Sequence, residues 1–425
     1  MNNEQSGQKK MRRDALWNAA GSLVYALSSM VLAFAVIRMA GAEEGGIFGF
    51  GFSTLGQQLF IAAYFGIRPF HITDMKKEYS FSEYLLARRM TTSAAVLLAA
   101  VFVLGFLMAG RYTPHKAGIL FLLCLYKIID GYADVYESEL QRQGQLYRTG
   151  QSLFFRSIGS VFLLLSVLGI SGRLFPACAA AVLGQAAGTA AFAVRPLMAC
   201  LPAEPAADRQ AALRLLRGTW MLFLSVFLDF YVFSAAKYAV DAGLGSAYSG
   251  FFNILFMPTS FIYLLANFLI RPLLTRLAEE YAEAERDPGK YGTFAGTCRF
   301  MRRAVLVLCV GILLLACVFG HLGLWIFEQI LGSSAAGRLT SETVTFLLLV
   351  AGGGLYTFSC VSYYILVTMR QQKAIFTAYC IAAAAAAFLC GPAVRYYGLR
   401  GGAVANVILM LFLNGMFLLA ELRAR

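Results

Sequence analysis

The chain is dominated by apolar stretches that are long enough to cross a lipid bilayer as helices. About twelve such stretches recur along the 425 residues, with short polar joints between them, from residues 16–39 to residues 401–420. A bilayer hydrocarbon core of roughly 30 Å requires about 20 apolar residues in helical form. The sequence therefore predicts an all-α, polytopic integral membrane protein, and it leaves transport, lipid handling or intramembrane chemistry as classes of function.

The composition agrees with this prediction. Hydrophobic residues make up 59% of the chain and charged residues only 14%, whereas soluble domains are roughly 45–50% apolar. The net charge of +13 would suit a nucleic-acid partner, but Lys and Arg retained at the cytoplasmic face of a membrane protein explain it better. We expect no nucleic-acid partner.

The predicted spans form two sets of six. The first set covers residues 16–39, 47–70, 90–109, 117–136, 152–170 and 174–194, and the second covers residues 219–240, 246–270, 304–324, 343–369, 374–394 and 401–420. Of the Lys and Arg residues, 27 lie on the side of the amino terminus and 8 on the opposite side, with Lys127 inside a span. The positive-inside rule then predicts a multi-pass membrane protein with both termini in the cytoplasm.

The two halves of the chain repeat a local pattern. The second span ends with Arg68-Pro69 and the eighth with Arg271-Pro272, 203 positions later, and Gly41 has a counterpart at nearly the same distance in Gly243. A chance match between two Arg-Pro helix ends is the alternative. Because each half has an even number of spans, both halves insert in the same orientation, which is the arrangement of parallel repeats.

The repeat predicts three regions. A six-helix lobe covers residues 1–200, a cytoplasmic linker covers 201–217, and a second six-helix lobe covers 218–425. Within the second lobe, residues 273–303 carry apolar side chains at helical spacing and charges on the other faces. This pattern predicts a cytoplasmic amphipathic helix at the membrane interface.

Ionisable side chains inside the spans are the main candidates for a functional site, because each costs at least about 2.5–3.5 kcal/mol to insert. Lys127, Asp130 and Asp134 are spaced to share one face of the fourth span. They indicate either a hydrated wall or a self-neutralising group that locks the helix bundle. Asp229 in the seventh span, with Lys237 two turns later, indicates either a cation site or a helix–helix contact.

Three further arginines, Arg38, Arg68 and Arg271, lie at span ends, where long cationic side chains usually extend into the membrane interface. We expect no metal and no cofactor. The nine Cys form no C-x-x-C pair, the three His are dispersed, and the chain has no G-x-x-x-x-G-K-[ST] phosphate-binding loop.

Short motifs along nearly the whole chain point to one family. They are Asn18-x-x-Gly21, Arg38-Met39-Ala40-Gly41, Gly45-Gly46-Ile47-Phe48, Arg68-Pro69-Phe70-His71-Ile72-Thr73-Asp74, Phe81-Ser82-Glu83-Tyr84, Arg88-Arg89-Met90-Thr91, Asp229, Gly245-Ser246-Ala247-Tyr248, Pro258, Arg271-Pro272-Leu273-Leu274 and Tyr397-Gly398-Leu399-Arg400-Gly401-Gly402-Ala403. Together they resemble the polysaccharide-biosynthesis flippases (Wzx-type) of the multidrug/oligosaccharidyl-lipid/polysaccharide (MOP) superfamily.

The resemblance implies two six-helix lobes forming a V, alternating access, and transfer of an undecaprenyl-pyrophosphate-linked oligosaccharide to the outer leaflet for surface polysaccharide assembly. Membrane potential or a cation gradient would drive the transfer, and no enzymatic activity is expected. The expected partners are the lipid-linked oligosaccharide, membrane lipids, and polysaccharide polymerase and assembly proteins. The family's lumen is typically cationic, whereas the fourth span here carries two acids for one Lys.

On this hypothesis the candidates for binding the substrate headgroup are Arg38, Arg68, Lys127 and Arg271. The candidates for ion coupling or charge pairing are Asp130, Asp134, Asp229 and Lys237. One alternative is a cation-coupled multidrug exporter of the same superfamily. The other is a membrane polymerase or ligase acting on lipid-linked glycans, for which the largest external segment, residues 325–342, offers only the acids Glu328 and Glu342.

Overall fold

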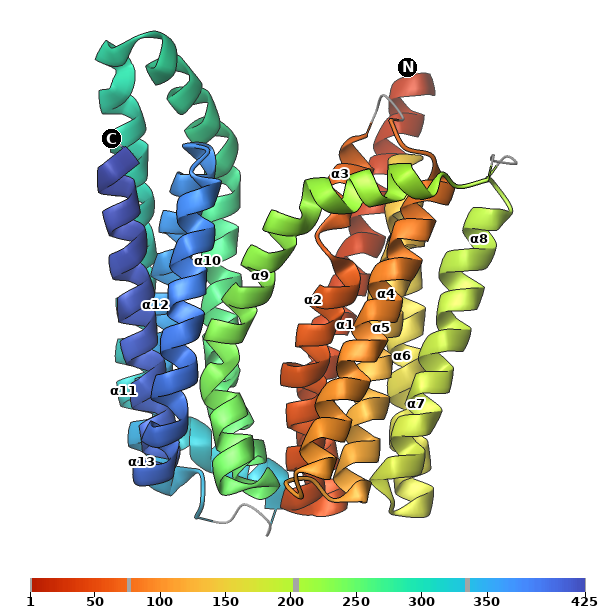
Figure 1. The fold of residues 1–425 in the computed structure, drawn as a ribbon, viewed down its shortest axis with the longest axis vertical. Helices are drawn as coiled ribbons and strands as arrows, with labels where there is room; N and C mark the ends of the chain where they lie inside the picture. The colour runs from red at the N-terminus through yellow and green to blue at the C-terminus, as the bar shows by residue number, and fades with distance from the viewer. Residues whose placement is uncertain (1, 75–77, 202–205, 333–336, 425) are drawn as a thin grey trace. The chain divides into compact units, whose positions relative to one another are not determined.

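The computed structural model describes residues 2–74, 78–201, 206–332 and 337–424, and all regular secondary structure in these ranges is helical. Figure 1 shows the elements, which are α1 (Asn2–Phe50), η1 (Gly51–Leu55), α2 (Gly56–Tyr64), α3 (Ile67–Thr73), α4 (Phe81–Met108), α5 (Pro114–Arg142), α6 (Leu146–Ser171), α7 (Leu174–Thr189), η2 (Ala190–Val194), α8 (Arg195–Met198), α9 (Arg209–Leu244), α10 (Ser246–Arg286), η3 (Pro288–Lys290), α11 (Tyr291–Leu331), η5 (Thr340–Glu342), α12 (Thr343–Thr368) and α13 (Gln372–Ala424).

Nine helical stretches within the described ranges are long and apolar enough to cross a membrane. Two of them, Arg12–Tyr64 and Gln372–Ala424, contain 53 residues each, which at 1.5 Å per residue is about 80 Å and enough for two crossings. Gly41 (φ 90°) interrupts the first and Gly398 (φ 59°) interrupts the second. With α5, the 29-residue charged helix, the described chain has twelve crossing segments, and the predicted all-α polytopic architecture is confirmed.

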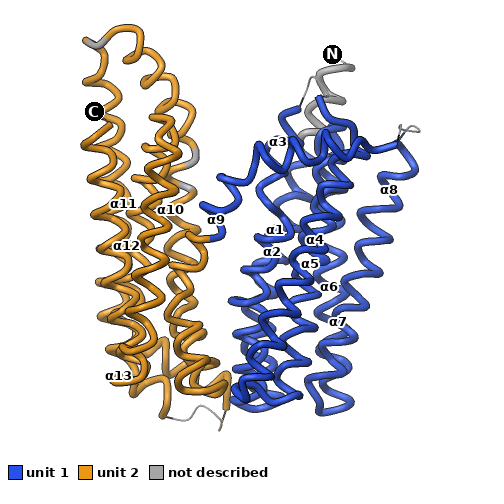
Figure 2. The backbone as a smooth tube through the Cα atoms, viewed as in Figure 1, with its two compact units in different colours: residues 1–227 blue, residues 228–425 orange. Residues whose placement is uncertain are grey.

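The chain divides into two compact units, an N-terminal unit of residues 1–227 and a C-terminal unit of residues 228–425 (Figure 2). The boundary lies inside α9, which begins at Arg209. The second half of the segment predicted as a linker, residues 201–217, is therefore helical rather than an open connection.

The segment predicted as an interfacial helix, residues 273–303, is not a separate element. α10 continues without a break to Arg286, and α11 begins at Tyr291 after the short turn η3. Leu277 of α10 is fully buried in one apolar cluster with Phe294 and Cys298 of α11. The apolar stripe of this segment is thus used for packing between α10 and α11.

α5 is the central helix of the N-terminal unit and packs against α2, α4, α6 and α7. The hydroxyl of Thr113 caps it by accepting a hydrogen bond from the Lys116 N–H at 3.2 Å, and Pro114 occupies the first helical position. Lys127 and Asp130 are buried on α5. Because the helix is surrounded, its charges face neighbouring helices and not lipid.

α12 has the corresponding central place in the C-terminal unit, between α10, α11 and α13. Three consecutive glycines allow this close packing. A Cβ atom on Gly352 would lie 2.4 Å from Asn406 of α13, and one on Gly353 would lie 2.8 Å from Thr259 of α10. Small residues at such contacts let the backbones of membrane helices approach one another.

The two units share a backbone feature at the start of their second crossing. Gly41 has φ 90° and ψ 173°, and Gly245 has φ 89° and ψ 177°, a conformation that favours glycine. The structural counterpart of Gly41 is therefore Gly245 and not Gly243, which the sequence had suggested. The structure also interrupts the predicted span at residues 47–70, because Phe65 and Gly66 both adopt the left-handed conformation between α2 and α3.

Candidate functional site

A network of buried ion pairs occupies the interior of the N-terminal unit, and Asp134 of α5 lies at one of its two centres. Arg88 of α4 contacts one carboxylate oxygen, Nη2 to Oδ2, at 2.9 Å, and its Nη1 donates to the Ala63 carbonyl at 2.7 Å. Arg68 of α3 pairs with the other oxygen of Asp134 and donates to Gln141 at 2.8 Å. Asp134 is therefore held between two guanidinium groups from different helices.

The second centre is Asp130, one turn earlier on α5. Arg156 of α6 approaches its Oδ1 at 2.6 Å, and the hydroxyl of Tyr25 on α1 donates to its Oδ2 at 2.8 Å. The same Nη2 of Arg156 lies 3.2 Å from Glu137, which also accepts a hydrogen bond from Ser152 at 2.8 Å. Three helices, α1, α5 and α6, are joined through these groups.

Lys127 is bound differently from the arginines. Its Nζ donates to the Tyr25 hydroxyl at 3.0 Å and lies 4.1 Å from the centroid of the Phe52 ring. No carboxylate within the described ranges forms a direct ion pair with it. The side chain is nevertheless only 3% exposed, so its charge is stabilised by a hydroxyl, an aromatic face and the nearby Asp130.

This network therefore holds one more cation than anions. The carboxylates are Asp130, Asp134 and Glu137, and the cations are Arg68, Arg88, Lys127 and Arg156. The sequence suggests a self-neutralising triad within α5 as one alternative, whereas in the structure the acids of α5 are neutralised across helices. Arg88 and Arg156 belong to the 27 cationic residues that the sequence places on the cytoplasmic side, and the structure buries both, at 0% and 2% exposed.

Arg68 is the most accessible member of the network. Its side chain is 25% exposed, against 7% for its partner Asp134. The short helix α3 carries it to this position after the left-handed break at Phe65 and Gly66. Of the three arginines in the network, Arg68 is therefore the one that is accessible from outside the unit.

A second contact fixes α3 on α5. His71, one turn after Arg68, is fully buried, and its Nε2 lies 2.8 Å from the Glu139 carboxylate. Its ring stacks on Tyr84 at 3.9 Å, and Glu139 is also held by Arg142 at 2.8 Å. Burial lowers the pKa of His71 below its usual value and outweighs the opposing effect of Glu139. A neutral ring with a proton on Nε2 donates to Glu139, so His71 holds Arg68 in place.

In the C-terminal unit, Asp229 of α9 lies among tyrosines. The hydroxyl of Tyr356 on α12 donates to its Oδ2 at 2.9 Å, and Tyr379 of α13 approaches the same carboxylate. The ring of Tyr263 on α10 lies 5.7 Å from that of Tyr356. Oδ1 of Asp229 is buried and has no hydrogen-bond partner in the described part of the chain.

Lys237, two turns after Asp229, is also buried, and its Nζ lies 4.3 Å from the centroid of Phe256. When Gly41 is matched to Gly245, Phe256 is the counterpart of Phe52, so each unit places a buried lysine on an equivalent ring. Asp229 is likewise the counterpart of Tyr25. Each unit therefore links its first and fourth crossings by a hydrogen bond between a tyrosine and a carboxylate. The tyrosine lies on the first crossing in the N-terminal unit and on the fourth crossing in the C-terminal unit.

Two predicted residues remain. Arg38 is exposed and lies three residues before Gly41. The side chain of Arg271 lies outside the described residues. No group of three or more His, Cys, Asp or Glu residues suited to a metal ion occurs in the described ranges.

The fold is that of MATE and other transporters of the MOP superfamily. The chain aligns with an inward-facing multidrug resistance MATE family transporter of this superfamily at TM-score 0.63 and 15% identity, covering 94% of both chains. A mutant MATE transporter from Vibrio cholerae aligns at TM-score 0.59 and 12% identity, over 100% of this chain and 98% of that one.

A third structure comes from a report that reverse polarity of the binding pocket suggests a different function for a MOP superfamily transporter from Pyrococcus furiosus. It aligns at TM-score 0.51 and 14% identity, over 98% of this chain and 95% of that one. Neither a family model nor a curated protein matches the sequence. At these identities the likeness concerns the fold.

Proposed function

We propose that this protein is a transporter that works by alternating access. The support is its fold, which aligns over 94% of the chain with a structure in the inward-facing conformation and over 98% with one in the outward-facing conformation. The two compact units, each built around a central helix, supply the two bodies that such a mechanism requires.

The proposed substrate is a polyprenyl-pyrophosphate-linked oligosaccharide, moved from the cytoplasmic to the outer leaflet for surface polysaccharide assembly. The observation that carries this choice is the surplus of one cation in the ion-pair network of the N-terminal unit. Its three acids are matched by Arg68, Arg88 and Arg156, and Lys127 adds a further positive charge. A network with a surplus positive charge favours a diphosphate headgroup and disfavours a cationic drug.

Elementary energetics explain why such a substrate needs a protein. Each hydroxyl moved without a partner into a hydrocarbon-like medium costs about 4–8 kcal/mol, so a sugar chain crosses only through a polar path. A diphosphate with about two negative charges gains roughly 4–5 kcal/mol per 100 mV on leaving a negative interior, at about 2.3 kcal/mol per charge. Membrane potential is therefore a sufficient driving force.

Within this proposal Arg68 and Lys127 bind the headgroup, and Arg38 and Arg271 are further candidates. Asp130 and Asp134 hold the cations in place and offset most of their charge in the empty protein. Asp229 and Lys237 are the candidates for ion coupling. The protein would lie in the inner membrane with both termini cytoplasmic, next to polysaccharide polymerase and assembly proteins.

The test uses proteoliposomes that contain the purified full chain and a polyprenyl-pyrophosphate-linked glycan in the inner leaflet. Glycan reaching the outer surface is measured with an external lectin under an imposed potential, negative inside. Arg68→Gln should slow transfer roughly 10- to 100-fold, because a hydrogen bond between charged groups contributes about 1.5–3 kcal/mol. Arg89→Gln, which changes an exposed arginine next to Arg88, is the control. If vesicles with the wild-type protein and protein-free vesicles transferred the glycan at the same rate, the proposed substrate would be rejected.

A cation-coupled multidrug exporter is the second candidate, and the Asp229 site favours it. Asp229 has one buried oxygen without a partner in the described part of the chain and is surrounded by the rings of Tyr356, Tyr379 and Tyr263. Such a site is suited to binding a proton, a sodium ion or an organic cation that lies against the rings. Efflux of a cationic dye that requires a proton or sodium gradient, and that Asp229→Asn abolishes, would select this function.

The polymerase or ligase alternative is less well supported, because the two acids it requires make local contacts. Glu328 accepts hydrogen bonds from the N–H groups of Leu339 and Thr340, both at 2.7 Å. Glu342 accepts one from the Thr345 hydroxyl at 2.5 Å. Both acids are therefore engaged with residues near the start of α12.

A further inference from the structure

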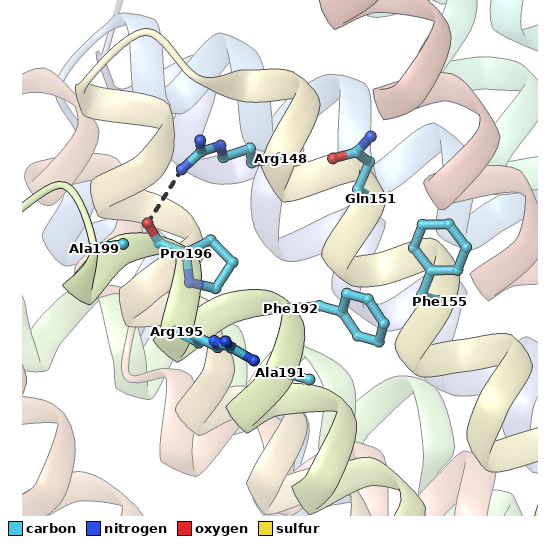
Figure 3. A pocket seen from close by; sticks show the side chains of 8 residues that line it. All are labelled: Arg148, Gln151, Phe155, Ala191, Phe192, Arg195, Pro196 and Ala199. Carbon is cyan, nitrogen blue, oxygen red and sulfur yellow. Dashed lines mark hydrogen bonds between the residues drawn. The ribbon is translucent and has the colours of Figure 1, made fainter.

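A pocket of about 510 Å³ opens on the N-terminal unit between α6 and the end of the sixth crossing, which consists of α7, η2 and α8. Figure 3 shows Arg148 and Gln151 of α6 on one side of it, Arg195 of α8 on the other, and the rings of Phe155 and Phe192 at one end. None of the eight lining residues is acidic. The volume lies in the range of ordinary ligand pockets.

The local sequence explains why the pocket exists. Pro196 has no N–H to bond to the Phe192 carbonyl one turn earlier, and its ring would clash with that carbonyl in a regular α-helix. The helix responds with the wider turn η2, in which the Arg195 N–H bonds to the Ala190 carbonyl, five residues back. Such wide turns are frequent at functional sites. The Pro196 carbonyl accepts from Arg148 Nη1 at 3.1 Å, which holds that side chain at the rim.

The pocket carries positive charge that the protein does not neutralise. Arg195 is exposed and makes no ion pair or hydrogen bond through its side chain in the described part of the chain. Arg148 is held by neutral groups only, which are the Pro196 carbonyl, the Tyr147 hydroxyl at 3.1 Å and the Cys200 sulfur at 3.3 Å. Two guanidinium groups thus face one cavity without a carboxylate.

The other end of the pocket is apolar. Phe155 and Phe192 stack with ring centroids 5.1 Å apart, and Trp17 of α1 lies 5.9 Å from Phe155. Arg148 is the third residue of α6, and Arg195 lies three residues before the end of α8. The charged side of the pocket therefore lies at the ends of two crossings, where lipid headgroups lie, and the aromatic side extends toward the hydrocarbon.

We propose that this pocket binds the headgroup of an anionic phospholipid. The phosphate would lie between Arg148 and Arg195, Gln151 would donate to a phosphate or glycerol oxygen, and the first methylenes of an acyl chain would lie on Phe155 and Phe192. Basic pockets between membrane helices are suited to such headgroups. The lipid is a bound component of the protein and not its transported substrate, so this inference does not depend on the proposed function.

Binding is measured by native mass spectrometry of the full chain in a neutral detergent, titrated with phosphatidylglycerol, with phosphatidylcholine of the same acyl chains, or with glycerol 3-phosphate. Wild type should bind phosphatidylglycerol most tightly. Arg195→Gln should weaken that binding about fivefold, which corresponds to about 1 kcal/mol per basic residue near an anionic surface. Arg173→Gln, which removes an exposed arginine at the opposite end of the α7 crossing, should leave it unchanged.

Arg148 also donates a hydrogen bond to the Pro196 carbonyl, so its removal could alter the helix as well as the charge. A lysine variant, which keeps the charge, separates these two effects. Arg148→Lys keeps the charge and should bind phosphatidylglycerol more tightly than Arg148→Gln does. Equal affinity of wild type for both phospholipids, or equal affinity of Arg195→Gln and Arg173→Gln for phosphatidylglycerol, would overturn the proposal. Glycerol 3-phosphate that binds as tightly as the lipid would also overturn it, because the site would then be one for a free phosphate ester.

Discussion

Two adjacent arginines on α4 have opposite environments. Arg88 is fully buried between Asp134 and the Ala63 carbonyl, whereas Arg89 is exposed. One residue along an α-helix turns the side chain by about 100°, which is enough to move it from the interior to the surface. The burial of Arg88 is tolerable because its charge is paired with Asp134 and both terminal nitrogens of its guanidinium group are hydrogen-bonded.

Removing the Arg88 guanidinium should be strongly destabilising. Arg88→Gln leaves Asp134 with fewer buried partners, and breaking a buried ion pair costs about 3–5 kcal/mol. Arg89→Gln should change stability by less than about 0.5 kcal/mol, as surface substitutions usually do. Thermal unfolding of the purified protein, followed by intrinsic fluorescence, compares the two. A smaller loss for Arg88→Gln than for Arg89→Gln would mean that the network contributes little to stability.

The buried histidine predicts a dependence on pH. Burial lowers the pKa of His71, so the unfolded chain takes up a proton near pH 6.5 that the folded chain takes up only at lower pH. Stability should therefore fall as the pH drops below about 6.5, by at most about 1.4 kcal/mol per pH unit for one proton. The groups that face His71 are Glu139, Arg142 and Tyr84, and none of them normally titrates between pH 5 and 7.

The corresponding measurement is the unfolding temperature between pH 7.5 and 5.5. Wild type should lose stability over this range, and His71→Gln, which can still donate to Glu139, should lose less. An identical pH profile in the two proteins would assign the acid sensitivity to other groups.

The position of an arginine on its helix face determines whether its side chain is buried, and the sequence contains this information in the spacing of the residues. The buried residues of α4 include Phe81, Tyr84, Arg88, Thr91 and Ala95, which follow one stripe at spacings of three and four. Arg88 lies on that stripe and Arg89 does not, so the helical phase contained the signal. The positive-inside count groups Arg88 and Arg89 together, because both lie just before the apolar run of α4, and it therefore does not separate the buried arginine from the exposed one.

Arg156 has the same explanation on α6. Its buried stripe runs through Thr149, Ser152, Ser160 and Leu164, and Arg156 lies in phase with them. Small polar residues along a membrane helix mark a face that contacts other helices. A charge on that face has a protein partner, which in this case comes from α5.

The crossing of α1 and α6 rests on two glycines. A Cβ atom on Gly150 would lie 2.4 Å from the carbonyl group of Trp17, and one on Gly21 would lie 2.5 Å from the Gly150 oxygen. The two backbones are therefore in direct contact. This contact gives a physical role to the Asn18-x-x-Gly21 motif of the first span, whose function the sequence alone left open.

A matched pair of alanine substitutions on α6 tests this crossing. Gly150→Ala should destabilise the protein by roughly 1–3 kcal/mol, because the added methyl group forces the backbones apart. Gly159→Ala has open space around the new Cβ and should stabilise by about 0.4–1 kcal/mol through the lower entropy of the unfolded chain. Chemical denaturation in detergent measures both. Similar values for the two variants would contradict the close contact.

For the molecule as a whole, the sequence predicts the number of crossings well, because that number depends on local apolar length. The repeat was also detectable, although its register was corrected when Gly245 proved to share the conformation of Gly41. Pairings such as Tyr25 with Asp130 could not be predicted, since they join residues 105 positions apart. A tertiary contact of this kind leaves no pattern in a single sequence.

The predicted orientation, with both termini in the cytoplasm, can be tested because it assigns each loop between crossings to one side of the membrane. The joint after α4 contains Arg111 and the joint after α6 contains Arg173, while Cys200 follows α8 in the joint after the next crossing. If 27 of the cationic residues mark the cytoplasmic side, Arg111 and Arg173 face the exterior and Cys200 faces the cytoplasm. All three positions are exposed, so a membrane-impermeant maleimide can reach them.

In a cysteine-free background, Arg111→Cys and Arg173→Cys should react in intact cells, and a protein that retains only Cys200 should react in inverted vesicles. The charge difference between the two faces is large, so we expect complete sidedness and not a mixture. Labelling of Cys200 in intact cells, with protection of the other two positions, would reverse the orientation. The candidate headgroup site at Arg68 would then lie in the outer leaflet, where a flippase would release its substrate and not collect it.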